Sequence, residues 1–337
     1  MVAGQLSYII VSMRKVSEYW PELATSLLFL VVVYFMTMMA TGHNDGKFIY
    51  DMDDAYIHMA LAKNMVLYHT WGVYGSEFTS LSSSLLWTVV IYLSYLVFGI
   101  NEISPFILNL FFALGTIFLA GYILSKFRIS RPVKFIILVA MVFLAPLPAI
   151  SFSGLEHNAH IMLTIAYIFV AAKALGYSSS GLTDTWHDYR RYRYFLFGLA
   201  PFLVAARYEG MFLLGMVSFL FLVRRKYITA IINSVLGLIP ISVFGIYAIS
   251  KGWFFLPNSI LIKSNTPNYK SLLGLAKYPA SFIVHLISYP HLLIFLALVL
   301  TILYLRLREK DNLWGEFNIL LVLFASIILL HAQFGCE

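Results

Sequence analysis

An acidic cluster near the start of the chain has the residue types of an acid–base or metal site. It consists of Asp51, Asp53 and Asp54, and His58 follows Asp54 by four residues. A carboxylate of such a cluster can act as a general base. Acids at a helix start are also ordinary caps, which is the plainer interpretation. With Glu156, the same acids could offer oxygen ligands to Mg²⁺ or Mn²⁺, and the sequence leaves the metal open.

The residues that follow the cluster predict an amphipathic helix lying along the membrane surface. Asp51 would cap this helix, and Asp54 and His58 would share one of its faces. Ile57, Leu61 and Met65 would form its apolar stripe. Three aspartates exceed what one cap requires, so we also expect a chemical role for this helix start.

Further charged or polar residues stand beside apolar segments. Glu156 precedes one, as either a cap or a functional acid. Arg207 and Glu209 either form an ion pair that fixes a turn, or Arg207 binds phosphate while Glu209 orients it. Asn258 and Lys263 follow another apolar segment, where a lone lysine is usually a membrane-surface anchor.

The composition places these residues in an integral membrane protein. Of the 337 residues, 61% are hydrophobic and 12% charged, against about 25% charged in a soluble domain. Recurring apolar runs predict an all-α, polytopic transmembrane helical bundle. The net charge of +7 then reflects basic residues retained on cytoplasmic loops, so no nucleic-acid partner is expected. The single cysteine, Cys336, excludes an internal disulfide.

Basic residues predict which apolar stretches cross the membrane. The stretches lie near 22–41, 85–99, 104–125, 132–150, 156–176, 194–223, 227–250, 286–305 and 315–333. Arg14 and the basic clusters at 126–134, 190–193, 224–226 and 306–310 should be cytoplasmic. An even number of crossings must then separate residues 22 and 126, so one stretch there does not cross. The stretch 85–99 reaches only roughly 22 Å against a core of about 30 Å, and we expect a re-entrant or interfacial helix.

The stretch 194–223 has basic residues at both ends, so we expect it to turn back as a hairpin of two short helices. Its tip at Arg207 and Glu209 would lie at membrane depth. The result is about nine crossings in one domain, 1–337, in the plasma membrane with a cytoplasmic N-terminus. We expect the chemistry to gather on the outer side, where 43–103 holds the candidate catalytic acids and 251–285 forms a second segment. The end at Glu337, directly after an apolar span, leaves open a C-terminally incomplete domain.

The order of motifs resembles the C superfamily of glycosyltransferases, integral-membrane enzymes that use polyprenyl-phosphate sugars. It is most similar to the bacterial branch with arabinofuranosyltransferases and mannosyltransferase-like proteins. Leu85 and Tyr208 stand where that family often has proline. The motifs that carry the resemblance are Asp53-Asp54-Ala55-Tyr56-Ile57, Trp71-Gly72, Glu77-Phe78-Thr79-Ser80, Ser82-Ser83-Ser84-Leu85-Leu86-Trp87, Ser153-Gly154-Leu155-Glu156, Arg207-Tyr208-Glu209-Gly210, and Leu256-Pro257-Asn258 with Lys263.

The resemblance implies an inverting transfer of a sugar from a polyprenyl phosphate to a hydroxyl of a glycan, lipid or protein acceptor. It implies that Asp53 is the catalytic base, with Asp54 second, and that Glu156 helps to bind donor or acceptor. Arg207 and Lys263 match cations near the lipid phosphate. We also expect His58, Glu209 and Asn258 to bind substrate, and membrane lipids to surround the protein.

Two other classes of protein share parts of this pattern. A transporter or flippase of a lipid-linked precursor would also carry charges within many spans, but transporters favour inverted repeats, and none is evident here. A non-catalytic membrane scaffold would not need the whole set of acids and cations. The gathering of acids on one side favours the enzyme.

Overall fold

The computed structural model describes residues 18–127, 129–176, 185–263, 287–309 and 312–334. Several features singled out in the sequence fall outside these residues. They are Arg14, Arg128, Lys310, Cys336, Glu337 and most of the outer segment 251–285. The inferences drawn from them stay predictions.

All regular structure in the described residues is helical, with 77% helix and no strand, which confirms the all-α prediction. Five helices are long and apolar enough to cross a membrane: α2 (Trp20–His43), α5 (Ser104–Ser125), α8 (His157–Gly176), α11 (Tyr227–Ser250) and α14 (Pro290–Arg308). Their length and composition agree with a membrane protein. The further crossings and their orientation stay predictions.

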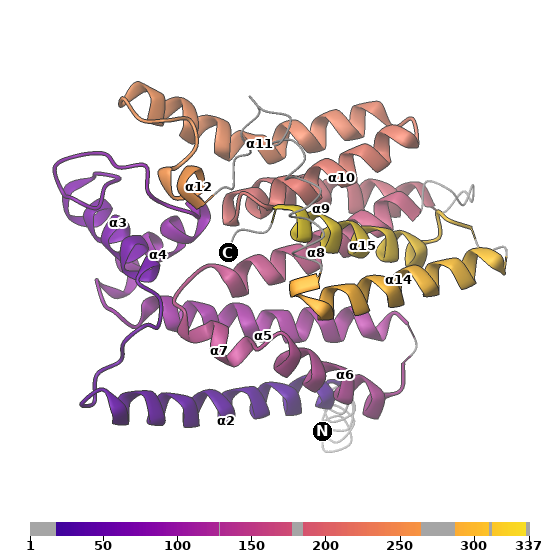
Figure 1. The fold of residues 1–337 in the computed structure, drawn as a ribbon, viewed down its shortest axis with the longest axis horizontal. Helices are drawn as coiled ribbons and strands as arrows, with labels where there is room; N and C mark the ends of the chain where they lie inside the picture. Colours follow the sequence, from indigo (N-terminus) through magenta and orange to yellow (C-terminus); the bar gives the residue numbers. More distant parts are fainter. Residues whose placement is uncertain (1–17, 128, 177–184, 264–286, 310–311, 335–337) are drawn as a thin grey trace, which may run out of the picture. The chain divides into compact units, whose positions relative to one another are not determined.

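The remaining helices are labelled in Figure 1. The apolar ones among them are α4 (Leu85–Phe98), α10 (Gly210–Val223) and α15 (Glu316–Phe334). The others are α3 (Asp54–Tyr68), α6 (Arg131–Leu144), α7 (Leu147–Phe152), α9 (Thr185–Ala206) and α12 (Asn258–Lys263).

Two details differ from the sequence prediction. The stretch 132–150 forms two helices, because α6 ends at Leu144 and α7 begins at Leu147, after Pro146. Proline lacks the backbone N–H that a continuous helix requires, so it ends the regular hydrogen-bonding pattern. The hairpin expected at 194–223 is present as α9 and α10, but its first arm begins earlier, at Thr185.

The chain divides into two compact units. Unit 1 contains the residues up to Ser76 together with Trp87–Ile165, and unit 2 contains Glu77–Leu86 and the residues from Ala166 onward. Helices α4 and α8 each contribute residues to both units. The single membrane domain predicted from the sequence stays a prediction.

Unit 1 is organised around α2 and α5, which run antiparallel. At one end, the backbone N–H of Phe106 at the start of α5 donates to the Tyr50 hydroxyl (3.1 Å), seven residues after α2 ends. At the other end, Gly121 of α5 lies directly against Glu22 of α2. Helices α6 and α7 pack on both. The core between them is apolar and aromatic, and includes Phe29, Val33, Phe106, Ala113, Ile117, Val142 and Phe152.

Unit 2 is built from the α9–α10 hairpin and α11, which packs against both of its arms, while α15 packs against α10 and α14. A buried polar network joins α8, α10 and α11. The Asn233 amide nitrogen donates to the Tyr167 hydroxyl (2.8 Å) and to Ser218 Oγ (3.0 Å). Interhelical hydrogen bonds of this kind hold helices together where water is excluded.

Basic residues gather at one end of unit 2. The Arg224 guanidinium donates to the Leu175 carbonyl (2.8 Å) and lies over the Trp314 ring, 4.4 Å from its centroid. Lys173 forms an ion pair with Glu316 at the start of α15. The turn between α9 and α10 lies at the opposite end, since Arg224 caps the far end of α10.

Candidate functional site

In unit 1, the acidic cluster begins α3, but it does not cap the helix as expected. The cap position belongs to Asp53 rather than Asp51, and the Asp53 side chain makes no capping hydrogen bond. Asp51 and Asp53 are exposed, and Asp54 is half-buried. The plain interpretation as a cap therefore does not account for the Asp53 carboxylate, which lies at the surface of unit 1.

Helix α3 buries a different face from the one predicted. Of the expected stripe of Ile57, Leu61 and Met65, only Leu61 is buried. The buried side instead includes Ala55, His58, Met59 and Ala62, which recur at the spacing of one helix face. Compared with the predicted orientation, α3 is therefore rotated about its own axis, so that His58 lies in the interior of unit 1.

His58 lies beside Glu156 in the interior of unit 1. Its Nε2 is 3.7 Å from Glu156 Oε2, and its Nδ1 is 2.8 Å from Thr88 Oγ1 on α4. Both His58 and Glu156 are only 1% exposed. Glu156 directly precedes α8 and accepts the first helical hydrogen bond through its carbonyl, from the His160 N–H (2.9 Å). The start of α8 therefore lies close to the buried face of α3.

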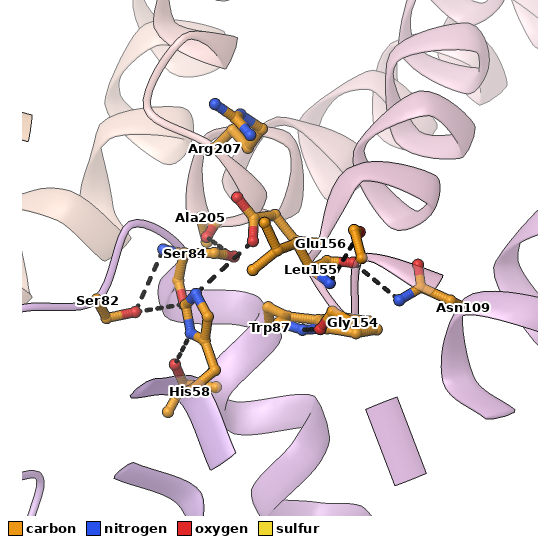
Figure 2. A network of polar contacts seen from close by, with 12 residues as sticks. His58, Ser82, Ser84, Trp87, Asn109, Gly154, Leu155, Glu156, Ala205 and Arg207 are labelled. Carbon is orange, nitrogen blue, oxygen red and sulfur yellow. Dashed lines mark hydrogen bonds and ion pairs between the residues drawn. The ribbon is translucent and has the colours of Figure 1, made fainter. Parts of the chain in front are cut away.

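The loop that carries Glu156 is held by side chains from two other helices (Figure 2). Trp87 Nε1 on α4 donates to the Gly154 carbonyl (2.9 Å), and Asn109 Nδ2 on α5 donates to the Leu155 carbonyl (2.9 Å). Gly154 has a φ of +69°, and an added Cβ would lie 2.6 Å from the Tyr50 ring. Only glycine fits this position without strain. Glu156 is thus fixed by backbone contacts on both preceding residues.

Tyr50 anchors the segment just before the acidic cluster. Its hydroxyl donates to the Glu102 carbonyl (2.7 Å), and its own N–H donates to the Tyr56 hydroxyl (3.1 Å). Burial raises the pKa of the Tyr50 phenol, so the hydroxyl stays protonated and keeps donating. The start of α3 is therefore attached to the rest of unit 1 on both sides of Asp53.

In unit 2, Arg207 and Glu209 form the ion pair that the sequence offered as one of two interpretations. Arg207 Nη2 donates to Glu209 Oε1 (2.7 Å), and Arg207 Nε donates to Glu209 Oε2 (3.3 Å). Their side chains are 25% and 37% exposed, so solvent reaches the pair. The intervening Tyr208 is buried and anchors the turn.

A serine-rich segment of unit 2 connects two of its predicted motifs. Ser84 Oγ donates weakly to the Ala205 carbonyl (3.5 Å) at the end of α9, beside the turn that holds Arg207 (Figure 2). The Ser80 carbonyl accepts a hydrogen bond from the Asn258 N–H (3.0 Å) at the start of α12. The Phe78 ring packs against two aromatic rings within α11 and against one just after that helix. Segment 77–86 thus links the α9–α10 turn to Asn258.

The sequence-predicted site residues therefore fall into two groups. Unit 1 holds Asp53, Asp54, His58 and Glu156, of which His58 and Glu156 meet. Unit 2 holds Arg207, Glu209, Asn258 and Lys263, of which Arg207 and Glu209 meet. Lys263 is the last residue of α12, and its side chain lies outside the described part of the chain.

Within the described residues, no three His, Cys, Asp or Glu side chains gather closely enough to hold a metal ion. The four acids named from the sequence thus form no such group.

The sequence interpretation did not assign the polar residues that support Glu156. Thr88, Asn109 and Asn158 are buried, and each lies in or beside an apolar stretch. Asn158 Nδ2 donates to Ser151 Oγ (3.0 Å) and so joins α8 to α7. Polar side chains in apolar helices usually have a partner inside the protein, and that signal could have identified them.

No family model, curated protein or solved structure matches the chain. A functional assignment for this protein therefore depends on its own residues and their geometry.

Proposed function

We propose that this protein is a membrane glycosyltransferase, which moves a sugar from a polyprenyl-phosphate donor to an acceptor hydroxyl. The observation that carries the proposal concerns Asp53 at the start of α3. Its carboxylate is exposed and makes no capping hydrogen bond, and the helix that carries it is anchored by the buried His58–Glu156 contact. An acid that serves only as a cap would bond the helix N-terminus. An exposed acid on a fixed support is suited to accept a proton from a substrate.

In the proposed reaction, Asp53 removes the proton of the acceptor hydroxyl. The acceptor oxygen attacks the anomeric carbon of the sugar, and the bond from that carbon to the phosphate oxygen breaks. The electron pair leaves with the polyprenyl phosphate, and the anomeric configuration inverts. Asp54, one residue on, is the second acid of the cluster.

The buried acid has a supporting role in this proposal. Because Glu156 and His58 are both 1% exposed, they hold α3 in place and position Asp53, rather than contact an exposed acceptor. Trp87 and Asn109 support this role, since both hold the backbone that leads to Glu156. Positioning of a base to within a fraction of an ångström is a large part of its catalytic effect.

The leaving phosphate requires positive charge, and Arg207 is the cation that we assign to it. A guanidinium offers a planar fork that suits two phosphate oxygens. Lys263 and Asn258 are proposed as further contacts to the donor. The lipid tail of the donor would lie among the exposed apolar side chains of the helices.

The proposal includes the membrane arrangement predicted from the sequence. It places the N-terminus in the cytoplasm, the acidic cluster outside the plasma membrane, and α4 as a re-entrant or interfacial helix. The fourteen residues of α4 support the last point, because they span only roughly 21 Å.

The test is transfer by the Asp53→Asn variant of the full chain in proteoliposomes. Polyprenyl phosphomannose and polyprenyl phosphoarabinose would be supplied with a membrane extract as acceptor, and release of polyprenyl phosphate measured. We expect at least about a hundredfold lower rate for Asp53→Asn, because general base catalysis contributes that much. Asp51→Asn, an exposed acid of the same cluster, is the matched control and should retain activity.

Equal release by the wild type and Asp53→Asn would refute the role of Asp53. Movement of the intact lipid-linked sugar across the bilayer, without release of polyprenyl phosphate, would instead identify a flippase.

A further inference from the structure

We propose that Glu209 occupies the place of the donor phosphate on Arg207, and leaves it when the phosphate binds. The inference rests on the proposed function, because it concerns the same phosphate site. It gives Glu209 a role opposite to that of orienting Arg207 toward its ligand: the carboxylate competes with the ligand.

The hydrogen bonding of Glu209 supports this role. Glu209 is the cap residue of α10, a position from which a side-chain oxygen can bond the helix N-terminus. Its side chain makes no such bond. Both carboxylate oxygens instead accept hydrogen bonds from Arg207, at 2.7 and 3.3 Å. The fork that suits two phosphate oxygens is thus taken up by two carboxylate oxygens.

The exposure of the pair makes an exchange of partners feasible. The side chains of Arg207 and Glu209 are 25% and 37% exposed. Water screens an ion pair at this exposure, so its net strength is small. A ligand phosphate can therefore displace the carboxylate, whereas a fully buried pair would resist displacement. The turn itself does not depend on the pair alone, because Tyr208 anchors it as a buried residue.

Competition by Glu209 has a use in a transfer reaction. The donor is a phosphodiester with one negative charge, and the leaving polyprenyl phosphate is a monoester that carries more charge. A site with an unopposed arginine would hold this product more tightly than the donor. The return of Glu209 to Arg207 weakens the binding of both anions and so favours product release.

The experiment compares binding of farnesyl phosphate and farnesol to the full chain in detergent, by isothermal titration calorimetry. Farnesol has the same lipid tail without phosphate, so the difference between the two reports on the phosphate site. We expect about twofold to fivefold tighter farnesyl phosphate binding by both Glu209→Gln and Glu209→Ala, as expected for the loss of a partly exposed competing charge. Glu309→Gln removes an exposed acid at the end of α14 and should leave binding unchanged. Arg207→Ala should lose the preference for farnesyl phosphate.

The outcomes separate the two proposals. Unchanged or weaker binding by a folded Glu209 variant, with Arg207→Ala still defective, would overturn the competing role of Glu209 and leave the phosphate site intact. No preference for farnesyl phosphate in the wild type would remove the phosphate site and this inference with it. Size-exclusion chromatography verifies folding. The two Glu209 variants are independent tests, and both should bind farnesyl phosphate more tightly than the wild type.

Discussion

Gly154 is the residue on which the position of Glu156 most directly depends. It combines a left-handed backbone with close contact to the Tyr50 ring, and its carbonyl accepts the Trp87 hydrogen bond. A side chain at this position would disturb the loop, the aromatic core and the buried acid together. The sequence motif Ser153-Gly154-Leu155-Glu156 thus joins a backbone requirement to a charged side chain.

We predict that Gly154→Ala destabilises the protein by about 2–4 kcal/mol. The left-handed conformation costs a residue with a Cβ about 1–2 kcal/mol, and the overlap with Tyr50 adds a further penalty. Gly99→Ala is the matched control. Gly99 also has a positive φ, of +79°, but nothing lies within 4 Å of an added Cβ, so only the backbone cost applies. Chemical denaturation in detergent, followed by circular dichroism, measures the difference, and equal losses in the two variants would contradict the predicted overlap.

At the scale of elements, unit 1 contains a buried ion pair that joins α2 to α6. Lys134 Nζ donates to Glu22 Oε1 (2.5 Å) and to Ser125 Oγ (3.0 Å). The side chains of Lys134 and Glu22 are 6% and 2% exposed. Gly121 allows this contact, because an added Cβ would lie 2.3 Å from Glu22 Oε1.

We predict that Lys134→Met destabilises unit 1 by about 3–5 kcal/mol, because it leaves the Glu22 charge buried without its partner. The double variant Lys134→Met, Glu22→Gln should recover a large part of this loss, since no charge then remains. Lys126→Met removes an exposed lysine at the end of α5 and should have little effect. Thermal melts of the three variants in one detergent give the comparison. A double variant as unstable as the single one would argue against the buried charge as the cause.

Apolar length and basic flanks predicted the positions of most helices, because a helix that crosses the bilayer core needs roughly 20 mostly apolar residues. The α9–α10 hairpin and the short α4 were predicted in this way. Two features depended on contacts between helices, which the sequence order does not contain. Lys134 belongs to a basic cluster that we expect on the cytoplasmic side, and the sequence does not indicate that it is buried against Glu22. The buried face of α3 was misplaced because the stripe of largest apolar residues differs from the side that packs.

The same reasoning applies to the candidate site. Motif order indicated Glu156 and Arg207, and the Arg207–Glu209 ion pair was one of two interpretations, but the sequence did not indicate that Glu156 would meet His58. Those contacts depend on the rotation of α3 and on the geometry of the turn before α10, which are set by packing.

On the scale of the whole molecule, each unit by itself carries motif residues at one end and a group of basic residues at the other. In unit 1, the acidic cluster follows α2, whereas Lys126 and Arg131 lie at the other end of the antiparallel α2–α5 pair. In unit 2, the turn with Arg207 and the end with Arg224 lie at opposite ends of α10. If the basic end of unit 1 faces the cytoplasm, as we propose, the acidic cluster of that unit lies outside.

We predict that Lys47→Cys, but not Lys126→Cys, reacts with a membrane-impermeant maleimide in intact cells. Both lysines are exposed, and they lie at opposite ends of unit 1. The variants would be made with Cys336→Ser, which removes the chain's single cysteine. Permeabilised cells are the control, in which both positions should react. Labelling of Lys126→Cys alone in intact cells would reverse the proposed orientation.

The pairing of Glu22 with Lys134 also constrains the order of events during synthesis. The two residues are separated by 112 positions, so the ribosome completes α2 and α5 before the lysine exists. Until then, Glu22 has no partner in this contact and is best accommodated at the water-facing edge of the bilayer. Helix α2 can therefore reach its final position only after α6 has emerged from the ribosome. Although α2 is synthesised before α5 and α6, we expect it to reach its final position only after α6 has formed this contact.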